Sequence, residues 1–331
     1  MPQFEHYRAT HPCPICGEND ALLIADSCRS GEPLKTVMCL RCGLGRRDPL
    51  PADEELFVYY SQNYRAEIGK GRKPANGRLW RIAACAAARA DDVLARGAGP
   101  ATLDFGCGAS ELVYLLGRAG CASRGFDPDS SHIAWAQSTL GVNVEHQAYK
   151  TVAVAPASMD LVTMYHVLEH IPDPAAALRH CHRWLKDDGL LVVEVPNFIS
   201  VQQAPGHQFI KGHLYYFHRE ALCALARQCG FVCESGGVYD RDENIRCYFR
   251  KATQVEDSID WMPANVSTVR VVLEAHGKLA HYTSSAPYAR MYSKFSRNIS
   301  EALHTFGKDA LDILDVHARR LQGKCRKASA L

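Results

Sequence analysis

Residues 103–129 combine two features that together could bind a nucleoside: a glycine-containing turn and an acidic residue farther along the chain. Gly106 and Gly108 follow an apolar run that ends at Asp104. Because glycine has no Cβ, the backbone can turn tightly here and a ligand can lie against it. Asp127 ends a second apolar run about 20 residues later, where a carboxylate can hold ribose hydroxyls. The spacing predicts a nucleoside-cofactor site on a doubly wound α/β sheet.

The charge of this turn indicates the kind of cofactor. A dinucleotide site has a third glycine three positions after the second one, where this chain has Glu111. The positive end of a helix favours anions, so a pyrophosphate placed there would compete with the Glu111 carboxylate. A cationic or zwitterionic ligand avoids this conflict. The alternatives are a domain that binds another nucleotide and a domain that has lost its ligand.

The sequence of the turn, Asp-Phe-Gly-Cys-Gly at 104–108, resembles motif I of the class I S-adenosylmethionine (SAM) methyltransferases. The resemblance continues in the same order through segments 125–128, 160–174 and 185–196. It implies SAM as cofactor and a Rossmann-like α/β fold with a seven-stranded mixed sheet. The cofactor-binding residues that it implies are Asp104, Phe105, Gly106, Cys107, Gly108, Asp127, Pro128, Gln147, Ala148, Tyr165 and His166.

Two CxxC pairs near the N-terminus, Cys13/Cys16 and Cys39/Cys42, are each followed by glycine. Each pair places two thiolates on one tight turn, and two such turns complete a tetrahedral site for Zn²⁺. Four protein ligands leave no open position, so the pattern predicts structural rather than catalytic zinc. Four unligated thiols are the alternative, but so short a segment needs a stabilising cross-link.

The elements that position these residues alternate as βαβ units do. Strands are predicted near 101–105, 122–126, 142–146, 159–165, 189–195, 231–239 and 245–250, the last two forming an antiparallel edge. Helices are predicted near 79–94, 109–118, 130–139, 174–185 and 219–229. The predicted domains are a zinc-binding module at 1–48, a helical connector or lid at 49–98, a SAM-binding Rossmann-like domain at 99–251 and a helical C-terminal extension at 252–331.

Two long helices are predicted in the C-terminal extension, at 266–282 and 293–321. The second carries one apolar stripe with helical spacing, formed by Ile299, Leu303, Phe306, Ala310 and Ile313. Such a stripe has to be covered. We expect it to pack on the chain's own domain. The alternative is a subunit interface, which would make the protein a homo-oligomer through its C-terminal helices.

The composition limits the classes of protein to which this chain can belong. The chain has 331 residues and 47% hydrophobic content, enough for a full α/β core with smaller additions. A net charge of +2 gives no basic field for nucleic acid, so no nucleic-acid partner is expected. Neither a signal peptide nor a transmembrane run is evident, and the 14 cysteines are better interpreted as metal ligands and reduced core residues. These observations predict a cytoplasmic protein.

The candidate catalytic residues are two histidines, His213 and His166, expected in loops at the ligand edge of the sheet. His170, in Leu-Glu-His, is expected to have a structural role. Segment 212–217 resembles the His-Leu-x-Tyr-Phe segment of zinc-containing sugar C-methyltransferases, and the CxxC pairs and the tyrosines at 59, 60 and 64 agree with that group. In those enzymes a Tyr and a Glu precede the His, whereas this chain has Ile210 and Gly212.

Because of this departure, the predicted reaction is O-methylation of a small molecule, a saccharide or nucleotide sugar, with a histidine as base. Sugar C-methylation is one alternative, and RNA methylation with the zinc module gripping RNA is a second. The low number of basic residues near the cysteines and the missing Asn-Pro-Pro-Tyr-type motif disfavour RNA. A third alternative is a SAM-binding scaffold without catalytic activity.

Overall fold

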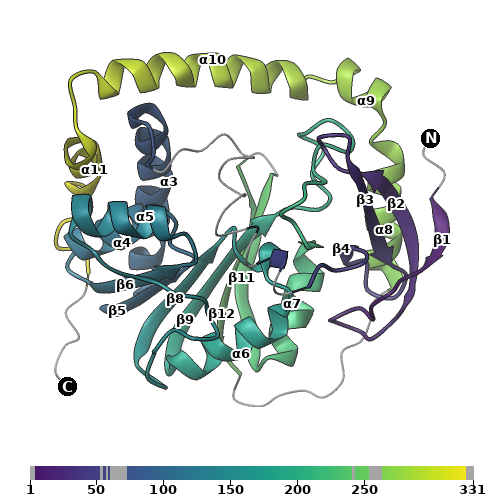
Figure 1. Cartoon of the computed structure of the whole chain (residues 1–331), viewed down its shortest axis with the longest axis horizontal. Helices are drawn as coiled ribbons and strands as arrows, with labels where there is room; N and C mark the ends of the chain where they lie inside the picture. The colour runs from purple at the N-terminus through teal and green to yellow at the C-terminus, as the bar shows by residue number, and fades with distance from the viewer. Residues whose placement is uncertain are drawn as a thin grey trace. The chain divides into compact units, whose positions relative to one another are not determined.

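The computed structural model describes residues 4–52, 55, 56, 59, 73–240, 243–252 and 263–325. Its largest sheet contains β5 (Ala101–Phe105), β6 (Ala122–Asp127), β7 (Asn143–His146), β8 (Met159–Tyr165), β9 (Leu185–Pro196), β11 (Phe231–Tyr239) and β12 (Asn244–Lys251). The strand order is β11-β12-β9-β8-β5-β6-β7 (Figure 1). The predicted seven-stranded Rossmann-like sheet is confirmed, and β9 begins earlier than predicted.

The direction of the strands fixes where a ligand can bind. Strand β5 is parallel to both its neighbours, β6 and β8, and β6 is parallel to β7. The β11–β12 pair is antiparallel, which makes the sheet mixed as predicted. The chain continues from β5 to β6 on one side and returns to β8 on the other, so the strand order reverses at β5. Ligands of open α/β sheets bind outside the carboxyl ends of the strands at such a reversal.

The described helices follow the predicted alternation. They are α3 (Asn76–Ala95), α4 (Glu111–Arg118), α5 (Ser130–Trp135), α6 (Pro174–Trp184), α7 (Arg219–Gln228), α8 (Pro263–Ala275), α9 (Lys278–Thr283), α10 (Ala286–Thr305) and α11 (Ala310–Ala318). Helix α5 continues into a π-helical turn at Ala136–Leu140. Residues 190–193 of β9 are all buried, as expected for a strand covered by helices on both faces.

Internal contacts divide the chain into two compact units. One comprises residues 1–52, 165–182 and 193–292, and the other comprises residues 53–164, 183–192 and 293–331. In the second unit, α11 packs on α3 and α4, and the Tyr114 hydroxyl donates a hydrogen bond to Asp315 at 2.6 Å. Part of the C-terminal extension therefore covers the Rossmann-like helices of its own unit.

The first unit contains a smaller antiparallel sheet built around the cysteine pairs. Its strands are β1 (Glu5–Arg8), β2 (Asp20–Ser27), β3 (Pro33–Cys39), β4 (Gly45–Arg47) and β10 (Tyr215–Tyr216), in that order. Strand β10 comes from a distant part of the sequence and pairs Tyr215 with Arg46 and Tyr216 with Gly45. The cysteine-containing segment and the segment around His213 thus share one sheet.

The prediction of two uninterrupted C-terminal helices is wrong. The first is interrupted at Gly277, between α8 and α9, and the second at Gly307, between α10 and α11. Asp309 then begins α11 with a capping box, in which its side chain accepts the Asp312 N–H. The predicted stripe is broken as a result: Ile313 is buried in α11, whereas Phe306 is 91% exposed. A subunit interface through these helices stays a prediction.

Among the helices that the structure describes, none is long and apolar enough to cross a membrane.

Candidate functional site

The turn after β5 is closely fitted to the end of β6. The backbone N–H groups of Gly106 and Cys107 both donate to the carbonyl oxygen of Phe126, at 2.9 and 3.1 Å. Gly106 and Gly108 have φ values of 74° and 54°, a conformation that side chains disfavour. A Cβ added to Gly125 of β6 would lie 2.8 Å from the Cβ of Cys107. These glycines therefore let the turn lie directly on the neighbouring strand.

Asp104 lies at the carboxyl end of β5 and is buried. Its side chain accepts a hydrogen bond of 2.7 Å from the hydroxyl of Thr163 on β8. Burial raises the pKa of Asp104 to about 7, and the nearby charges of Glu111 and Asp127 add to this rise. The charge of Arg89 acts in the opposite direction, but the pKa of Asp104 stays raised, so a further cationic group would stabilise the three carboxyl groups near this turn.

Asp127 ends β6 and connects the turn to the start of α5. One carboxylate oxygen accepts the Gly108 N–H at 2.9 Å, and the other accepts the Asp129 N–H at 2.8 Å. Asp129 in turn caps α5 by accepting the N–H groups of Ser131 and His132. The structure therefore brings Asp127 to the glycine turn, as the sequence predicted, and gives it two backbone partners.

The other predicted cofactor residues lie around these two strand ends. Phe105 and Cys107 are buried, and the Phe105 ring lies 4.7 Å from that of Phe126. The carbonyl oxygen of Pro128 contacts the His146 ring nitrogen at 3.0 Å. Gln147 follows β7, is exposed, and donates its backbone N–H to Asp127 at 3.3 Å. The carbonyl oxygen of the next residue, Ala148, accepts hydrogen bonds from the residues that follow.

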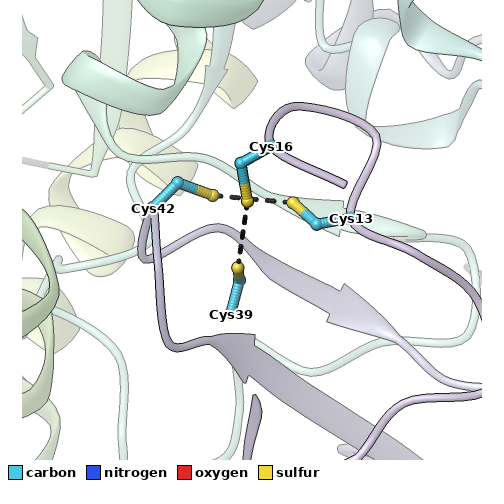
Figure 2. Close-up of side chains that lie close together, drawn as sticks. All are labelled: Cys13, Cys16, Cys39 and Cys42. Carbon is cyan, nitrogen blue, oxygen red and sulfur yellow. Dashed lines mark hydrogen bonds between the residues drawn. The ribbon is translucent and has the colours of Figure 1, made fainter. Parts of the chain in front are cut away.

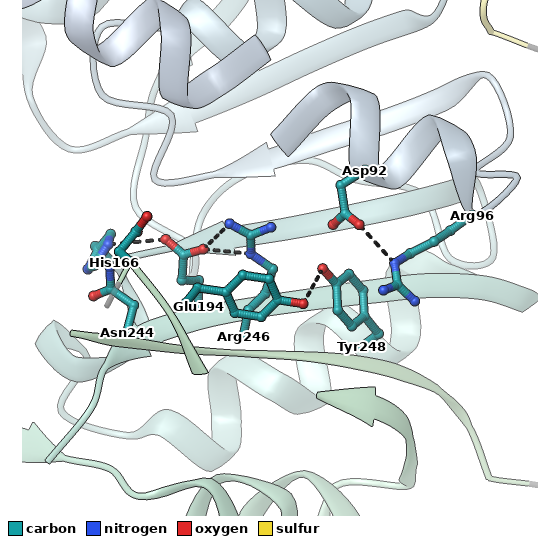
Figure 3. A network of polar contacts seen from close by, with 9 residues as sticks. Asp92, Arg96, His166, Glu194, Asn244, Arg246 and Tyr248 are labelled. Carbon is teal, nitrogen blue, oxygen red and sulfur yellow. Dashed lines mark hydrogen bonds and ion pairs between the residues drawn. The ribbon is translucent and has the colours of Figure 1, made fainter. Parts of the chain in front are cut away.

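His166 directly follows β8 and is held among buried charged groups (Figure 3). Its backbone adopts φ 58°, which costs energy for a residue other than glycine and is frequent at functional sites. The Nε2 atom lies 3.3 Å from Glu194 Oε1, and Nδ1 lies 3.5 Å from Glu169 Oε1. The imidazole is 38% exposed. A partly accessible ring between two carboxylates is suited to gaining a proton.

Glu194 and Arg246 complete this arrangement and were not predicted as site residues. Glu194 lies on β9 with no exposed surface; its Oε2 accepts a hydrogen bond of 2.6 Å from Arg246 Nε and forms an ion pair of 2.6 Å with Arg246 Nη2 (Figure 3). The Arg246 guanidinium also lies over the ring of Tyr165, 5.6 Å from its centroid. The signal in the sequence was a glutamate within an apolar strand, since buried carboxylates require partners.

A second histidine cluster lies beside Glu169. The ligand atoms of Glu169, His170 and His213 all lie within 4.8 Å of one another, close enough to share a metal ion. His170 Nδ1 donates to the carbonyl oxygen of Gly212 at 2.6 Å, which gives His170 the structural partner that was expected. Burial and the neighbouring His170 lower the pKa of His213 to about 3, so this half-buried ring is neutral at pH 7.

Glu169 is buried beside these rings. Burial alone would raise its pKa, but the surrounding histidines outweigh burial and the pKa is lowered. Its backbone carbonyl also accepts the Leu214 N–H at 2.8 Å. Glu169 thus links the segment after β8 to the segment that carries His213.

The four predicted metal ligands converge in the first unit (Figure 2). The Sγ atoms of Cys13 and Cys42 are 3.5 Å apart, and those of Cys16 and Cys39 are 3.4 Å apart. A tetrahedral zinc site with Zn–S bonds of about 2.3 Å needs sulfur separations of roughly 3.8 Å, so a small expansion would suit the ion. The glycines after each pair close the two turns by donating to Cys13 and Cys39.

Some features predicted from the sequence cannot be located. The tyrosines at 60 and 64, and with them residues 60–72 of the predicted connector or lid, lie outside the described residues.

The chain matches a family model described as a methyltransferase domain over residues 79–235. It is 34% identical over 106 residues to a ubiquinone biosynthesis O-methyltransferase of Pseudomonas paraeruginosa, covering 30% of this chain and 46% of the relative. A protein of the same name from Pseudomonas fluorescens is 37% identical over 98 residues, covering 28% and 42%. The chain thus spans less than half the length of these curated relatives.

Among solved structures, the chain is similar to the 1,6-didemethyltoxoflavin-N1-methyltransferase of Burkholderia thailandensis, with a TM-score of 0.49 and 19% identity. The superposed part covers 66% of this chain and 96% of that protein. It is also similar to the magnesium protoporphyrin IX methyltransferase of Synechocystis, with a TM-score of 0.45 and 18% identity, covering 61% and 100%. The family match and the seven-stranded sheet agree with motif I and its acidic partner. Residues 79–235, just under half of the chain, therefore match a methyltransferase domain, as motif I predicted.

Proposed function

We propose that this chain is a SAM-dependent O-methyltransferase that acts on a small-molecule hydroxyl, with a saccharide or nucleotide sugar as acceptor. The observation that carries the cofactor is the charge of the turn after β5. Asp104, Glu111 and Asp127 are close enough for the last two to raise the pKa of the first. A ligand with a positive sulfonium and ammonium relieves their repulsion, whereas a pyrophosphate would increase it.

In this proposal each group of predicted residues binds a different part of the cofactor. Asp127 binds the ribose, Asp104 meets the amino end, and the backbone around Gly106 and Gly108 follows the methionyl part. Gln147 and Ala148, after β7, lie near the adenine, and Tyr165 and His166 lie near the methionyl group. When bound, SAM supplies an electrophilic methyl group. The tasks left to the protein are to orient the acceptor, exclude water and take the hydroxyl proton.

We assign the proton transfer to His166 rather than to His213. Glu194, 3.3 Å from Nε2, stabilises the protonated ring, and the acceptor hydroxyl would take the place of the longer 3.5 Å Glu169 contact and give its proton to Nδ1. His213 is neutral and weakly basic because its pKa is lowered to about 3, and we give it a positioning role next to His170.

A saccharide acceptor is supported by the shared sheet of the cysteine segment and β10, since both carry the resemblance to sugar methyltransferases. A phenolic acceptor is the second candidate, because the curated relatives are named for O-methylation in ubiquinone biosynthesis. Formation of S-adenosylhomocysteine (SAH) from SAM can be measured with nucleotide sugars and with catechols. Turnover confined to sugars supports the proposal. Turnover confined to catechols would show instead that the acceptor is a phenol.

The pKa of Asp104 predicts how cofactor binding depends on pH. At pH 6 a carboxyl with a pKa of about 7 is mostly protonated, and at pH 8 it is mostly ionised. Because only the ionised form attracts a cationic ligand, SAH affinity should rise by about tenfold between these values. Titration calorimetry at both values tests this, with Asp104→Asn as the comparison. A wild-type affinity that does not change with pH would contradict the role of Asp104.

We also propose that Cys13, Cys16, Cys39 and Cys42 hold a structural Zn²⁺. Removing zinc with a strong chelator should lower Tm by roughly 10 °C or more, because structural zinc contributes several kcal/mol to folding. Acidification should release the ion as well, since the ligands are thiolates. Elemental analysis and thermal scans of wild type and Cys39→Ser test this, with exposed Cys85→Ser as control. Zinc-free wild type that unfolds at the same temperature would refute the site.

A further inference from the structure

A second group of cysteines, distinct from the four near the N-terminus, converges in the first unit. Cys223 on α7, Cys233 on β11 and Cys247 on β12 place their Sγ atoms within 4.8 Å of one another. Helix α7 packs on both strands, which brings its thiol to the other two. Three sulfur atoms from three separate elements form a donor set of a single chemical type.

The register of β11 and β12 places two of these cysteines on one face of the sheet. Cys233 pairs with Phe249, and Gly236 pairs with Cys247, so one extra residue, Glu234, is inserted in β11 between these pairs. Cys233 lies opposite Phe249, which is two residues from Cys247, and side chains two residues apart share a face of a strand. Cys233 and Cys247 therefore lie on the same face, and the β-bulge places Gly236 rather than Ser235 opposite Cys247.

Two further details leave space around the sulfurs. A Cβ added to Gly236 would lie 2.7 Å from Cys247 Sγ, so only glycine accommodates the thiol at this cross-strand position. Cys247 is fully buried, whereas Cys223 and Cys233 are only half-buried. The group thus has a closed inner side and an outer side that an ion can reach.

We propose that Cys223, Cys233 and Cys247 form a binding site for a soft, thiophilic metal ion, with three thiolate ligands and a fourth position open to solvent. Sulfur-only donor sets select ions such as Cu(I) and Zn²⁺ over hard cations. Three protein ligands leave one coordination position free, unlike the four-cysteine site.

The local charge is compatible with thiolates. Arg219 lies one turn before Cys223 on α7. Its charge acts on Cys223, Cys233 and Cys247 together. The guanidinium therefore offsets part of the negative charge that three thiolates bring to one ion.

Cadmium is a suitable probe because its thiolate complexes absorb in the ultraviolet. Reduced, zinc-loaded full-length protein is titrated with Cd²⁺ without oxygen, and released zinc is measured with a chromogenic chelator. We expect one equivalent of Cd²⁺ to bind without release of zinc. Cys223→Ser should weaken this binding at least tenfold, because one of three ligands is lost. Cys85→Ser, an exposed cysteine on α3, should bind as wild type does.

Two results would overturn the site. One is cadmium uptake by wild type only with equimolar release of zinc, which would place the ion at the four-cysteine site. The other is wild-type affinity in Cys223→Ser. If that variant does not fold, as judged by circular dichroism, Cys233→Ser at the other half-buried position takes its place under the same criteria.

Discussion

His166→Gln should lower kcat for methyl transfer by about 100-fold or more and lower SAH affinity far less. Glutamine retains a polar side chain near Glu194 and Glu169 but cannot take a proton from the acceptor hydroxyl, and general-base catalysis contributes roughly 10²–10⁴-fold. The measurement is the rate of SAH formation with the best acceptor, together with calorimetric titration of SAH.

The comparison variant is His6→Gln, an exposed histidine on β1 that should retain full activity. Wild-type kcat in His166→Gln would show that another group takes the proton. A loss of SAH affinity with an unchanged kcat would instead assign His166 to the cofactor. Either result would contradict its role as base.

Asp127→Ala should weaken SAH binding by about 100-fold. Loss of two charge-assisted hydrogen bonds to a ribose corresponds to about 3 kcal/mol or more. The same substitution removes the acceptor for the N–H groups of Gly108 and Asp129, which adds to the loss. Asp127→Asn keeps the size and one acceptor oxygen, so its affinity should lie between those of Asp127→Ala and wild type.

Asp160→Asn is the matched control for this experiment. Asp160 belongs to β8 but contacts the N–H of Ala101, at the amino end of β5. Its substitution should affect stability without changing SAH affinity. Equal affinities for Asp127→Ala and wild type, with both proteins folded, would remove Asp127 from the site.

The Rossmann-like sheet was predictable because its central strands, such as β5 and β8, are short apolar runs bounded by turns. Strand β5 ends at the glycine turn, and β6 ends at Asp127, just before Pro128. Local patterns of this kind specify both the element and its neighbour in a βαβ unit. The cysteine site was predictable for the same reason. Each CxxC pair lies within one turn, and the two pairs together supply the four ligands of one cluster.

Features that depend on contacts between distant residues were not predictable in this way. The pairing of β10 with β4 involves only two residues and follows from tertiary packing. Glu194 and Arg246 lie on different strands, and nothing in the sequence around either residue indicates that the two pair. The bulge in β11 depends on register with β12, which a single strand does not specify. The interruptions at Gly277 and Gly307 were missed because apolar spacing continued across both glycines.

Calorimetric titration of the zinc-loaded protein with SAH tests the central claim most directly. The structure predicts one molecule per chain with a micromolar Kd, equivalent to about −8 kcal/mol, and no comparable binding of NAD or another pyrophosphate. Absence of measurable SAH binding by folded protein, or tighter binding of the pyrophosphate compound, would contradict the account.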